Sequence, residues 1–364
     1  MSAKIWYKNY SELRKQVADL NEAFEESCER LKLSSDEVLG EFTQEILTRA
    51  VHESNWQEGL ELEKGKTQKF AQLAFDEFQG LEEPSLDMKK ILAVHRARVI
   101  ALFDGGASEE EVGAYNLAFA HTCSSWVELE LTLKDGVGYI KGAKEACDRY
   151  ASNKEVFPLE HHQFFDDTNK MVEEKISDRT PFKWPIIPNI RGDFTAELLK
   201  YEKDDLHHPL RKEHIKFLHK IIMMGILDPS RAGEFRRESA HVGNPDVYFS
   251  PPAAIDGMME EFCRSFPVGA EEGDPILLAA QVSHSFVLIH PFEDGNGRLS
   301  RVIMNMILFG YFPPVYLKAD SKGRHRYSQA LRKADRGDLE PLAALICMSL
   351  IEIFNKVNRA IARR

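Results

Sequence analysis

The stretch that decides the fold runs HPFEDGNGR from His290 to Arg298 and lies between two apolar segments with helical spacing. Residues 275–289 form the first of these segments. Pro291 stops that helix, because its ring cannot continue the hydrogen-bond ladder. Residues 298–309 form a second apolar helix. The sequence therefore predicts a glycine loop that joins two helices and opens at a helix N-terminus.

The residue types in this loop favour chemistry on phosphates. Gly295, Asn296 and Gly297 let successive backbone N–H groups point into one concavity at the positive end of the next helix, which is suited to an anion. Asp294 is a hard oxygen ligand of the kind that Mg²⁺ on a nucleotide phosphate requires. His290 is a base that ordinarily titrates near neutrality.

Two arginines add positive charge to the same place. Arg298 and Arg301 are three residues apart on the predicted helix and so share one face. A base, a metal ligand, an anion nest and two cations thus fall within one short segment, which predicts a nucleotide-transfer site. Glu293 is the other carboxylate of the loop and could replace Asp294 as the metal ligand.

Other sites with related sequences fit less well. Asp-Gly-Asn-Gly is often only a turn between helices. In the register of an EF-hand loop, Phe292 and Ile303 would occupy positions 1 and 12, where neither side chain can bind calcium. The GxGxxG and GxxxxGK(S/T) spacings of dinucleotide and P-loop sites are absent from the segment.

Composition limits the partners of this 364-residue chain. Its net charge of -11 leaves no excess of Lys and Arg to replace phosphate counterions, so we predict no nucleic-acid partner. No run of about 18 apolar residues and no signal-peptide core is present, which predicts no membrane association. The five cysteines are scattered and never form CxxC, which favours reduced thiols and a cytoplasmic location.

Helical signals dominate the chain and predict a mainly α fold with a helical N-terminal region. Ser108 followed by Glu111 predicts a capping box at a helix start. Residues 236–252 contain β-prone runs closed by two prolines, which predicts a small surface hairpin. The predicted helices span residues 11–32, 68–78, 87–103, 210–224, 253–265, 275–289, 298–309, 325–335 and 338–357.

The segment from His290 to Arg298 resembles the signature of the Fic (filamentation induced by cAMP) family, HPFx(D/E)GN(G/K)R, with Arg301 as the family's second arginine. The resemblance covers about residues 196–350. It implies a Fic-type helical core with a small β-hairpin flap, the flap being the predicted hairpin. The domains would be a helical region at 1–104, a helical insertion and linker at 105–195, and a catalytic domain at 196–364.

The resemblance also implies an activity and a role for each site residue. The chain would be a protein adenylyltransferase that moves AMP from ATP, with Mg²⁺, to a Ser, Thr or Tyr hydroxyl of a target protein. His290 would deprotonate that hydroxyl, and Asp294 would hold Mg²⁺. Gly295, Asn296 and Gly297 would position the α- and β-phosphates. Glycine at the last of these positions, where a kinase-like branch of the family has Lys, favours AMP transfer.

For the two arginines, the resemblance implies contact with the β- and γ-phosphates, through Arg298 and Arg301. Far upstream, residues 54–59 fit (S/T)xxxE(G/N), which resembles the inhibitory-helix motif of Fic proteins. On a helix, Ser54 and Glu58 would share a face. The resemblance implies that Glu58 pairs with Arg301 and keeps the γ-phosphate out of its productive position.

Several alternatives stay open at this point. The same fold could remove AMP, with Glu58 aligning a water molecule. Tyr327 stands alone where many relatives have two tyrosines, and Asp335 replaces a frequent Asn, so transfer of another nucleotide such as UMP is a second alternative. The third is a non-catalytic regulatory or scaffold protein, against which the intact signature argues. The oligomeric state is open, a homodimer included.

Overall fold

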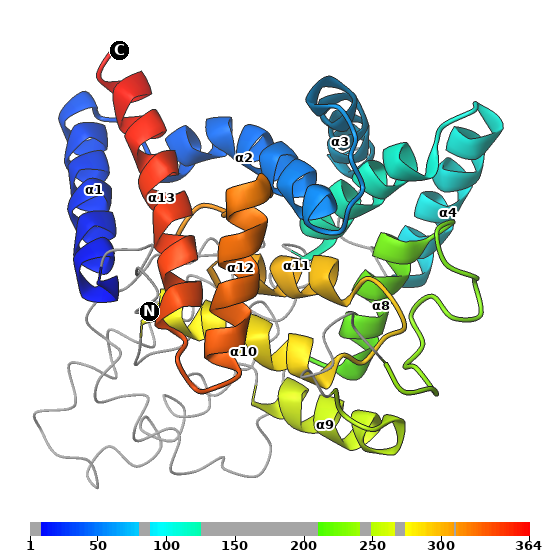
Figure 1. Cartoon of the computed structure of the whole chain (residues 1–364). Helices are drawn as coiled ribbons and strands as arrows, with labels where there is room; N and C mark the ends of the chain where they lie inside the picture. The colour runs from blue at the N-terminus through cyan, green and yellow to red at the C-terminus, as the bar shows by residue number, and fades with distance from the viewer. Residues whose placement is uncertain (1–8, 80–87, 125–209, 241–248, 266–273, 309–310) are drawn as a thin grey trace, which may run out of the picture. The chain divides into compact units, whose positions relative to one another are not determined.

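A computed structural model of the chain describes residues 9–79, 88–124, 210–240, 249–265, 274–308 and 311–364, and these residues are almost entirely helical (Figure 1). A further helical run spans 109–124. The named helices are α1 (Tyr10–Leu31), α2 (Ser35–Gln57), α3 (Lys64–Gln79), α4 (Met88–Asp104), α8 (Lys212–Met223), α9 (Pro252–Arg264), α10 (Pro275–Ile289), α11 (Asn296–Leu308), α12 (Ser321–Ala334) and α13 (Glu340–Ile361). The predicted mainly α fold is confirmed.

The predicted helices agree with the observed ones to within a few residues. Helix α12, for example, begins at Ser321 and not at 325, because the Asp320 side chain caps it by accepting a hydrogen bond from the Gly323 amide at 2.6 Å. Apolar spacing does not mark α2 as a helix, although it is one of the longest described. The middle of the predicted hairpin, residues 241–248, lies outside the described residues.

Helix α10 lies in the core next to the loop that carries the site. It packs against α9, α11 and α13, and it is apolar on most sides, as expected of a largely buried helix. Asp274 caps its N-terminus by accepting from the Ile276 amide at 3.0 Å, and Pro275 occupies its first turn. The start of the loop is therefore fixed by a rigid, buried element.

The N-terminal helices pack onto the C-terminal half of the chain. Helix α1 lies along α13 (Figure 1), with the rings of Phe24 and Phe354 6.1 Å apart. Asn358 of α13 also donates to the Leu20 carbonyl at 3.1 Å. Helix α2 contacts both α11 and α13. These contacts bring residue 58 to the predicted site despite its distance in sequence.

The run at 109–124 packs against α8. The side chain of Asn116 donates to the carbonyls of Ile222 and Met224, at 3.3 and 2.8 Å. At its start, the Ser108 hydroxyl accepts from the Glu111 amide and the Glu111 carboxylate accepts from the Ser108 amide, so the predicted capping box is confirmed.

The chain divides into two compact units, one of Met1–Trp126 with Arg211–Arg364 and one of Val127–Leu210. All helices named here belong to the first unit. The predicted domain boundaries at 104, 195 and 196 stay predictions.

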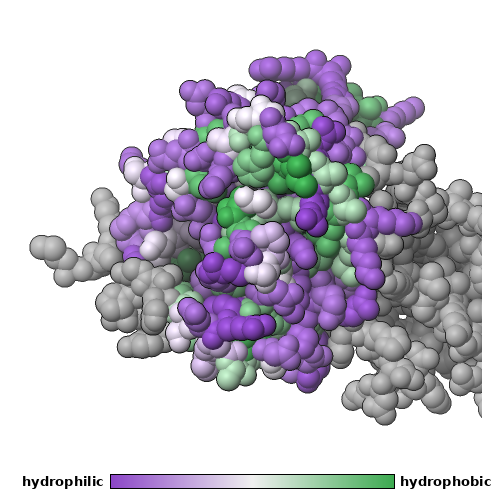
Figure 2. All heavy atoms as spheres, turned by 90° about the vertical axis from the view of Figure 1, so that its right-hand side faces the viewer, coloured by the Kyte–Doolittle hydropathy of each residue, from purple (hydrophilic) through white to green (hydrophobic). Residues whose placement is uncertain are grey.

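The face on the right of Figure 1 is mostly hydrophilic, with a smaller area of hydrophobic residues toward its centre (Figure 2).

Four cysteines of the described ranges, Cys28, Cys123, Cys263 and Cys347, are buried free thiols. None of the helices in those ranges has the length and apolarity to cross a bilayer.

Three buried histidines, His95, His121 and His219, make the stability of the fold depend on pH. Burial lowers the pKa of His95 to about 4, and burial helped by the charge of Arg301 lowers that of His121 to about 4. In an unfolded chain the imidazole pKa is about 6.5. Between pH 6.5 and 4 the unfolded state therefore binds more protons than the folded state. The free energy of unfolding must decrease as the pH is lowered through this range.

We expect this fall to amount to about 1.4 kcal/mol per pH unit for each of the three histidines. Urea unfolding at pH 4.5–7 measures the slope. His95→Gln should lower the slope by about one histidine's share, whatever it does to stability at pH 7. The exposed His325→Gln is the control. An equal slope in His95→Gln and wild type would contradict the assignment.

Candidate functional site

The loop after α10 begins with a strained residue. His290 ends the helix in the left-handed region, at φ 49° and ψ 57°, with its amide donating to the Phe286 carbonyl at 3.1 Å. Only glycine adopts this region at no steric cost. The turn places the imidazole beside the loop and directs the chain into α11.

The Asn296 side chain closes the loop on itself. Its Oδ1 accepts from the Phe292 amide at 3.0 Å, and its Nδ2 donates to the Phe292 carbonyl at 2.8 Å. Both groups are buried, so the pair satisfies backbone atoms that water cannot reach. The sequence analysis assigned Asn296 only its backbone amide, and this structural role of its side chain was missed.

The protonation of His290 follows from its contacts. Its Nδ1 lies 3.3 Å from the Val287 carbonyl oxygen, which can only accept, so Nδ1 carries the proton and Nε2 keeps a free lone pair. The imidazole stacks on Phe249 with centroids 3.9 Å apart. Burial lowers the pKa of His290 below its ordinary value, although the Val287 carbonyl and the carboxylates of Glu58 and Asp294 oppose the shift. The side chain is thus a neutral base at pH 7.

Gly295 shapes the concavity at the start of α11. It has φ 75°, and a β-carbon there would lie 2.7 Å from the Met223 sulfur of α8. Glycine alone combines this backbone with such a close approach. The first turn of α11 leaves its amides without intrahelical partners, so the predicted anion nest has the required backbone.

His219 of α8 supports the loop from beneath. Its Nδ1 accepts from the Gly233 amide and its Nε2 donates to the Asp294 carbonyl, both at 2.9 Å. The ring stacks on Phe292 with centroids 3.7 Å apart. Burial lowers the pKa of His219 to about 4, so it is neutral and holds one tautomer. Sequence reasoning missed it, although a histidine on the apolar face of a buried helix was a usable signal.

Arg298 is buried beside the nest with unused hydrogen-bond donors. Its side chain is 3% exposed, and its Nε and Nη1 have no hydrogen-bond partner among the described residues. One further nitrogen reaches the Asp294 carboxylate, at 3.5 Å. Burial lowers the pKa of Arg298, because its charge is desolvated. A buried guanidinium with unsatisfied donors is ready to bind an anion.

The two carboxylates of the loop differ in their partners. Glu293 pairs with Arg231, and both side chains are about half exposed. The Asp294 carboxylate is 60% exposed and accepts from the Gly295 amide at 2.5 Å. Asp294 thus has an accessible carboxylate at the lip of the nest, whereas Glu293 is already neutralised.

Arg301 is the point at which the upstream segment meets this loop. The Glu58 carboxylate lies 2.5 Å from Nη2 of Arg301, and the Ser54 hydroxyl and carbonyl accept from the same guanidinium at 2.7 and 3.0 Å. Burial lowers the pKa of Arg301, but the Glu58 carboxylate and the Tyr327 hydroxyl together outweigh it and raise the pKa. The predicted contact between Glu58 and Arg301 is present.

The C-terminus of α2 explains the form of the upstream motif. Glu58 is the C-cap, and Gly59 follows in the left-handed region at φ 82°. The amides of Gly59 and Leu60 donate to the carbonyls of Trp56 and Asn55, at 3.2 and 3.0 Å, which is a Schellman motif. Glycine after the glutamate therefore ends the helix with the carboxylate aimed at α11.

The Glu58 carboxylate also covers the glycine of the nest. A β-carbon built on Gly297 would collide with Oε1 of Glu58. Gly297 thus accommodates the carboxylate as well as any anion that approaches the amides of α11. Neighbouring Asn55 is buried, and neither polar atom of its amide has a partner within the described part of the chain.

A second row of contacts holds α2 from the other side. Arg49 donates to the Tyr316 hydroxyl at 2.9 Å, Glu53 accepts from the Ala319 amide at 2.7 Å, and Gln57 donates to the Lys318 carbonyl at 2.9 Å. These three residues of α2 are four apart and share one face.

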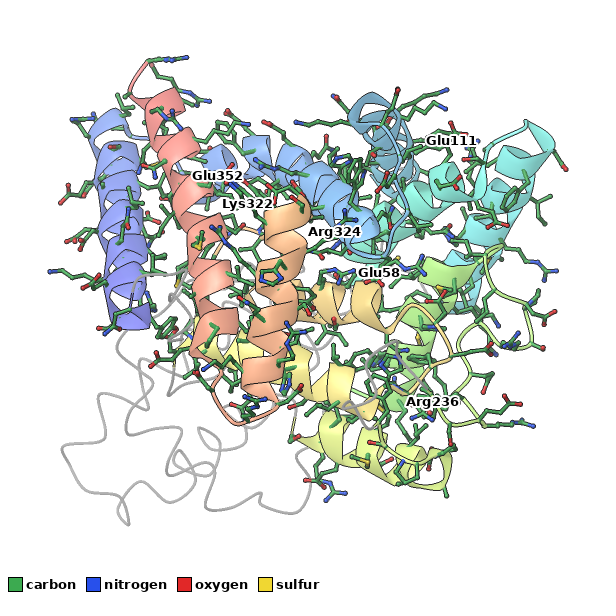
Figure 3. The ribbon with its side chains drawn as sticks, in the orientation of Figure 1. Glu58, Glu111, Arg236, Lys322, Arg324 and Glu352 are labelled. Atoms are coloured by element: carbon green, nitrogen blue, oxygen red, sulfur yellow. The ribbon has the colours of Figure 1, made fainter. Side chains whose placement is uncertain are left out.

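Arg324, in the first turn of α12, adds a bond to the Trp56 carbonyl at 3.3 Å (Figure 3). The end of α2 is therefore attached to both α11 and the segment before α12.

Each predicted site residue is described, and they form one site. Ser54, Glu58, Gly297 and Arg301 meet at the end of α2. The remaining residues lie on the adjacent loop or, for Asn296 and Arg298, in the first turn of α11. Among the described residues, no group of three or more His, Cys, Asp and Glu side chains could hold a metal ion alone. A metal there would need ligands from a bound anion as well.

Comparison with known proteins agrees with this geometry. The profile of the Fic/DOC family matches residues 209–308. The chain is 37% identical over 130 residues to "Protein adenylyltransferase Fic" of Culex quinquefasciatus, covering 34% of this chain and 24% of that protein. It is 32% identical over 145 residues to "Protein adenylyltransferase fic-1" of Caenorhabditis briggsae, covering 38% and 27%. The chain thus spans about a quarter of the length of these curated relatives.

Solved structures extend the likeness to the fold as a whole. A Fic domain containing signaling protein from Bacteroides thetaiotaomicron has a TM-score of 0.53 at 15% identity, covering 96% of this chain and 98% of that one. Fic-1 from C. elegans has a TM-score of 0.52 at 17% identity, covering 97% and 74%. The signature loop, the profile match and the shared helical fold agree: the chain contains a domain of the Fic/DOC family, at residues 209–308.

Proposed function

We propose that the chain transfers AMP from ATP to a Ser, Thr or Tyr hydroxyl of a target protein. The observation that carries this proposal is the buried Arg298 guanidinium, which lies in the first turn of α11 and has two nitrogens without a partner among the described residues. A polyphosphate anion would satisfy those donors and the first amides of α11 together. The names of the relatives, protein adenylyltransferases, support the same reaction.

His290 would act as the general base. Its Nε2 lone pair is free, and burial keeps the ring neutral, so it can accept the proton of the attacking hydroxyl. Oxygen of that hydroxyl would then form a bond to the α-phosphorus as the bond to the pyrophosphate oxygen breaks. Arg298, Arg301 and the nest amides would stabilise charge on the phosphates, which is the main demand of such a transfer.

Asp294 would hold the Mg²⁺ that accompanies ATP. The residues fit this role, because Mg²⁺ on a nucleotide needs only one or two protein carboxylates beside phosphate oxygens and water. Bound there, the ion would neutralise phosphate charge. Asp294 is exposed at the lip of the nest, and its backbone is fixed by His219.

Glu58 would keep the enzyme inactive until α2 moves. Its carboxylate takes the guanidinium of Arg301, which would otherwise hold the γ-phosphate, and covers Gly297. A charge-assisted bond of this kind contributes about 1.5–3 kcal/mol, or roughly ten- to hundred-fold in productive binding. Inhibition would thus be intramolecular.

Two finer points belong to the proposal. ATP is taken as the donor because the relatives are named adenylyltransferases. UTP is the competing nucleotide, because Tyr327, 5.9 Å from the Arg301 guanidinium, and Asp335, paired with His284, are the two departures from the family pattern. The same Glu58 carboxylate could align a water molecule for removal of AMP. A cytoplasmic location and the absence of a nucleic-acid partner stay predictions.

Glu58→Gly should raise self-modification and target modification by roughly ten- to hundred-fold, because it releases Arg301 and uncovers Gly297. Labelled ATP, CTP, GTP and UTP measure the rate and the nucleotide preference. Glu61→Gly, three residues away and exposed, is the matched control. No gain is expected when Arg301→Ala is added. A Glu58→Gly variant no faster than wild type would show that Glu58 is not the inhibitor. Loss of AMP removal in this variant would instead favour the reverse reaction.

His290→Ala, made in Glu58→Gly, should lower transfer by about 10²–10⁴ while ATP binding survives. In Glu58→Gly with His290 retained, the rate should fall with decreasing pH only below 6.5. The base must be neutral, and burial lowers the pKa of His290. Stopped assays between pH 5 and 8 give the profile, and calorimetry gives the affinity. An acid limb centred above 6.5 would mean that another group is the base.

Asp294→Asn should remove most of the gain in ATP affinity that Mg²⁺ brings, because the amide keeps the loop geometry but loses the charge. Calorimetric titration of ATP with and without Mg²⁺ measures it. Glu293→Gln is the matched control and should keep the metal dependence. The reverse result would assign the ligand to Glu293.

A further inference from the structure

Both the backbone and the imidazole of His290 are fixed by neighbouring groups. The backbone adopts the left-handed turn that ends α10, and its carbonyl accepts a hydrogen bond. The imidazole ring stacks on Phe249, which precedes Ser250 near the start of α9. Both contacts lead to the same buried side chain, Arg236.

Arg236 uses all three guanidinium nitrogens on backbone carbonyls. Its Nε donates to the His290 carbonyl at 2.7 Å, its Nη1 to the Glu238 carbonyl at 2.7 Å and its Nη2 to the Ser250 carbonyl at 2.5 Å. The Arg236 amide donates to the Pro291 carbonyl at 2.9 Å. The residue is 8% exposed. One side chain thus connects the strained turn to both described ends of the segment that carries Phe249.

We propose that Arg236 is a positioning residue for the base: it fixes the His290 turn and the ring that stacks on His290, so that Nε2 faces the reacting hydroxyl. All three guanidinium nitrogens of Arg236 donate to backbone carbonyls outside the predicted nest. In Figure 3 its label lies below that of Glu58. Its effect should therefore fall on the transfer step, not on ATP binding.

The charges around His290 give a second readout. Arg236 is the cation that faces it, and Glu58 and Asp294 are the carboxylates. The cation disfavours a proton on the imidazole, whereas both carboxylates favour one. Loss of the Arg236 charge should thus move the titration of His290 to higher pH, and a lysine that keeps the charge should move it less.

The test compares Arg236→Gln and Arg236→Lys in the full chain carrying Glu58→Gly. Arg237→Gln, the exposed neighbour, is the matched control. We expect Arg236→Gln to lower kcat at least tenfold relative to that control, with ATP affinity by calorimetry within twofold. Arg236→Lys should recover part of the rate. Histidine NMR titration should show the His290 midpoint displaced upward in Arg236→Gln.

This inference rests on the proposed function for its kinetic readout, but the NMR titration does not need activity. An inactive Glu58→Gly parent would overturn the proposed function and leave the titration to decide on Arg236. An unchanged His290 midpoint, a kcat equal to that of Arg237→Gln, or a parallel loss of ATP affinity in both Arg236 variants would each overturn the positioning role.

Discussion

A cation buried at the N-terminus of a helix needs an anion, and this requirement governs the whole site. Arg298 and Arg301 both lie in the first turns of α11, where the helix dipole is positive and water is excluded. Arg301 has its anion in Glu58, whereas within the described ranges Arg298 has only a long contact to Asp294. The structure thus combines one satisfied and one unsatisfied guanidinium on the same face. A bound phosphate would neutralise Arg298, and release of α2 would leave Arg301 in the same need of an anion.

The loop and the helix that covers it are held in different ways. The loop is bonded internally by Asn296, from beneath by His219 and from the side by Arg236, each through backbone atoms. Such bonds fix geometry and survive changes of ligand. Helix α2 is also bonded through backbone atoms at its C-terminal end, including the carbonyls of Ser54 and Trp56. It differs in burying the amide of Asn55, which has no hydrogen-bond partner among the described residues. That uncompensated group costs about 1–3 kcal/mol, so the covering helix is the element more easily displaced.

Much of this could be predicted from the sequence, because the signature is contiguous and each residue has a chemical reason. Apolar spacing also located most helices, since burial imposes a 3.6-residue period. Helix α2 escaped, because its buried positions are mixed with Ser54 and Asn55, polar residues that a pattern of burial does not reveal. His219 and Arg236 escaped for another reason. Their partners are backbone carbonyls and amides, which have no signature in a sequence, and only the fold shows that these atoms converge.

Gly297 serves two surfaces at once, the concavity of α11 and the carboxylate that covers it. A single added methyl group there would alter both, because no atom can occupy the volume where Glu58 now lies. The proposed reaction at the nest and its proposed inhibition by Glu58 would therefore not be independent traits of this chain. A descendant that exchanged this glycine for a larger residue would change both in one step, and would need to build a new inhibitory contact elsewhere.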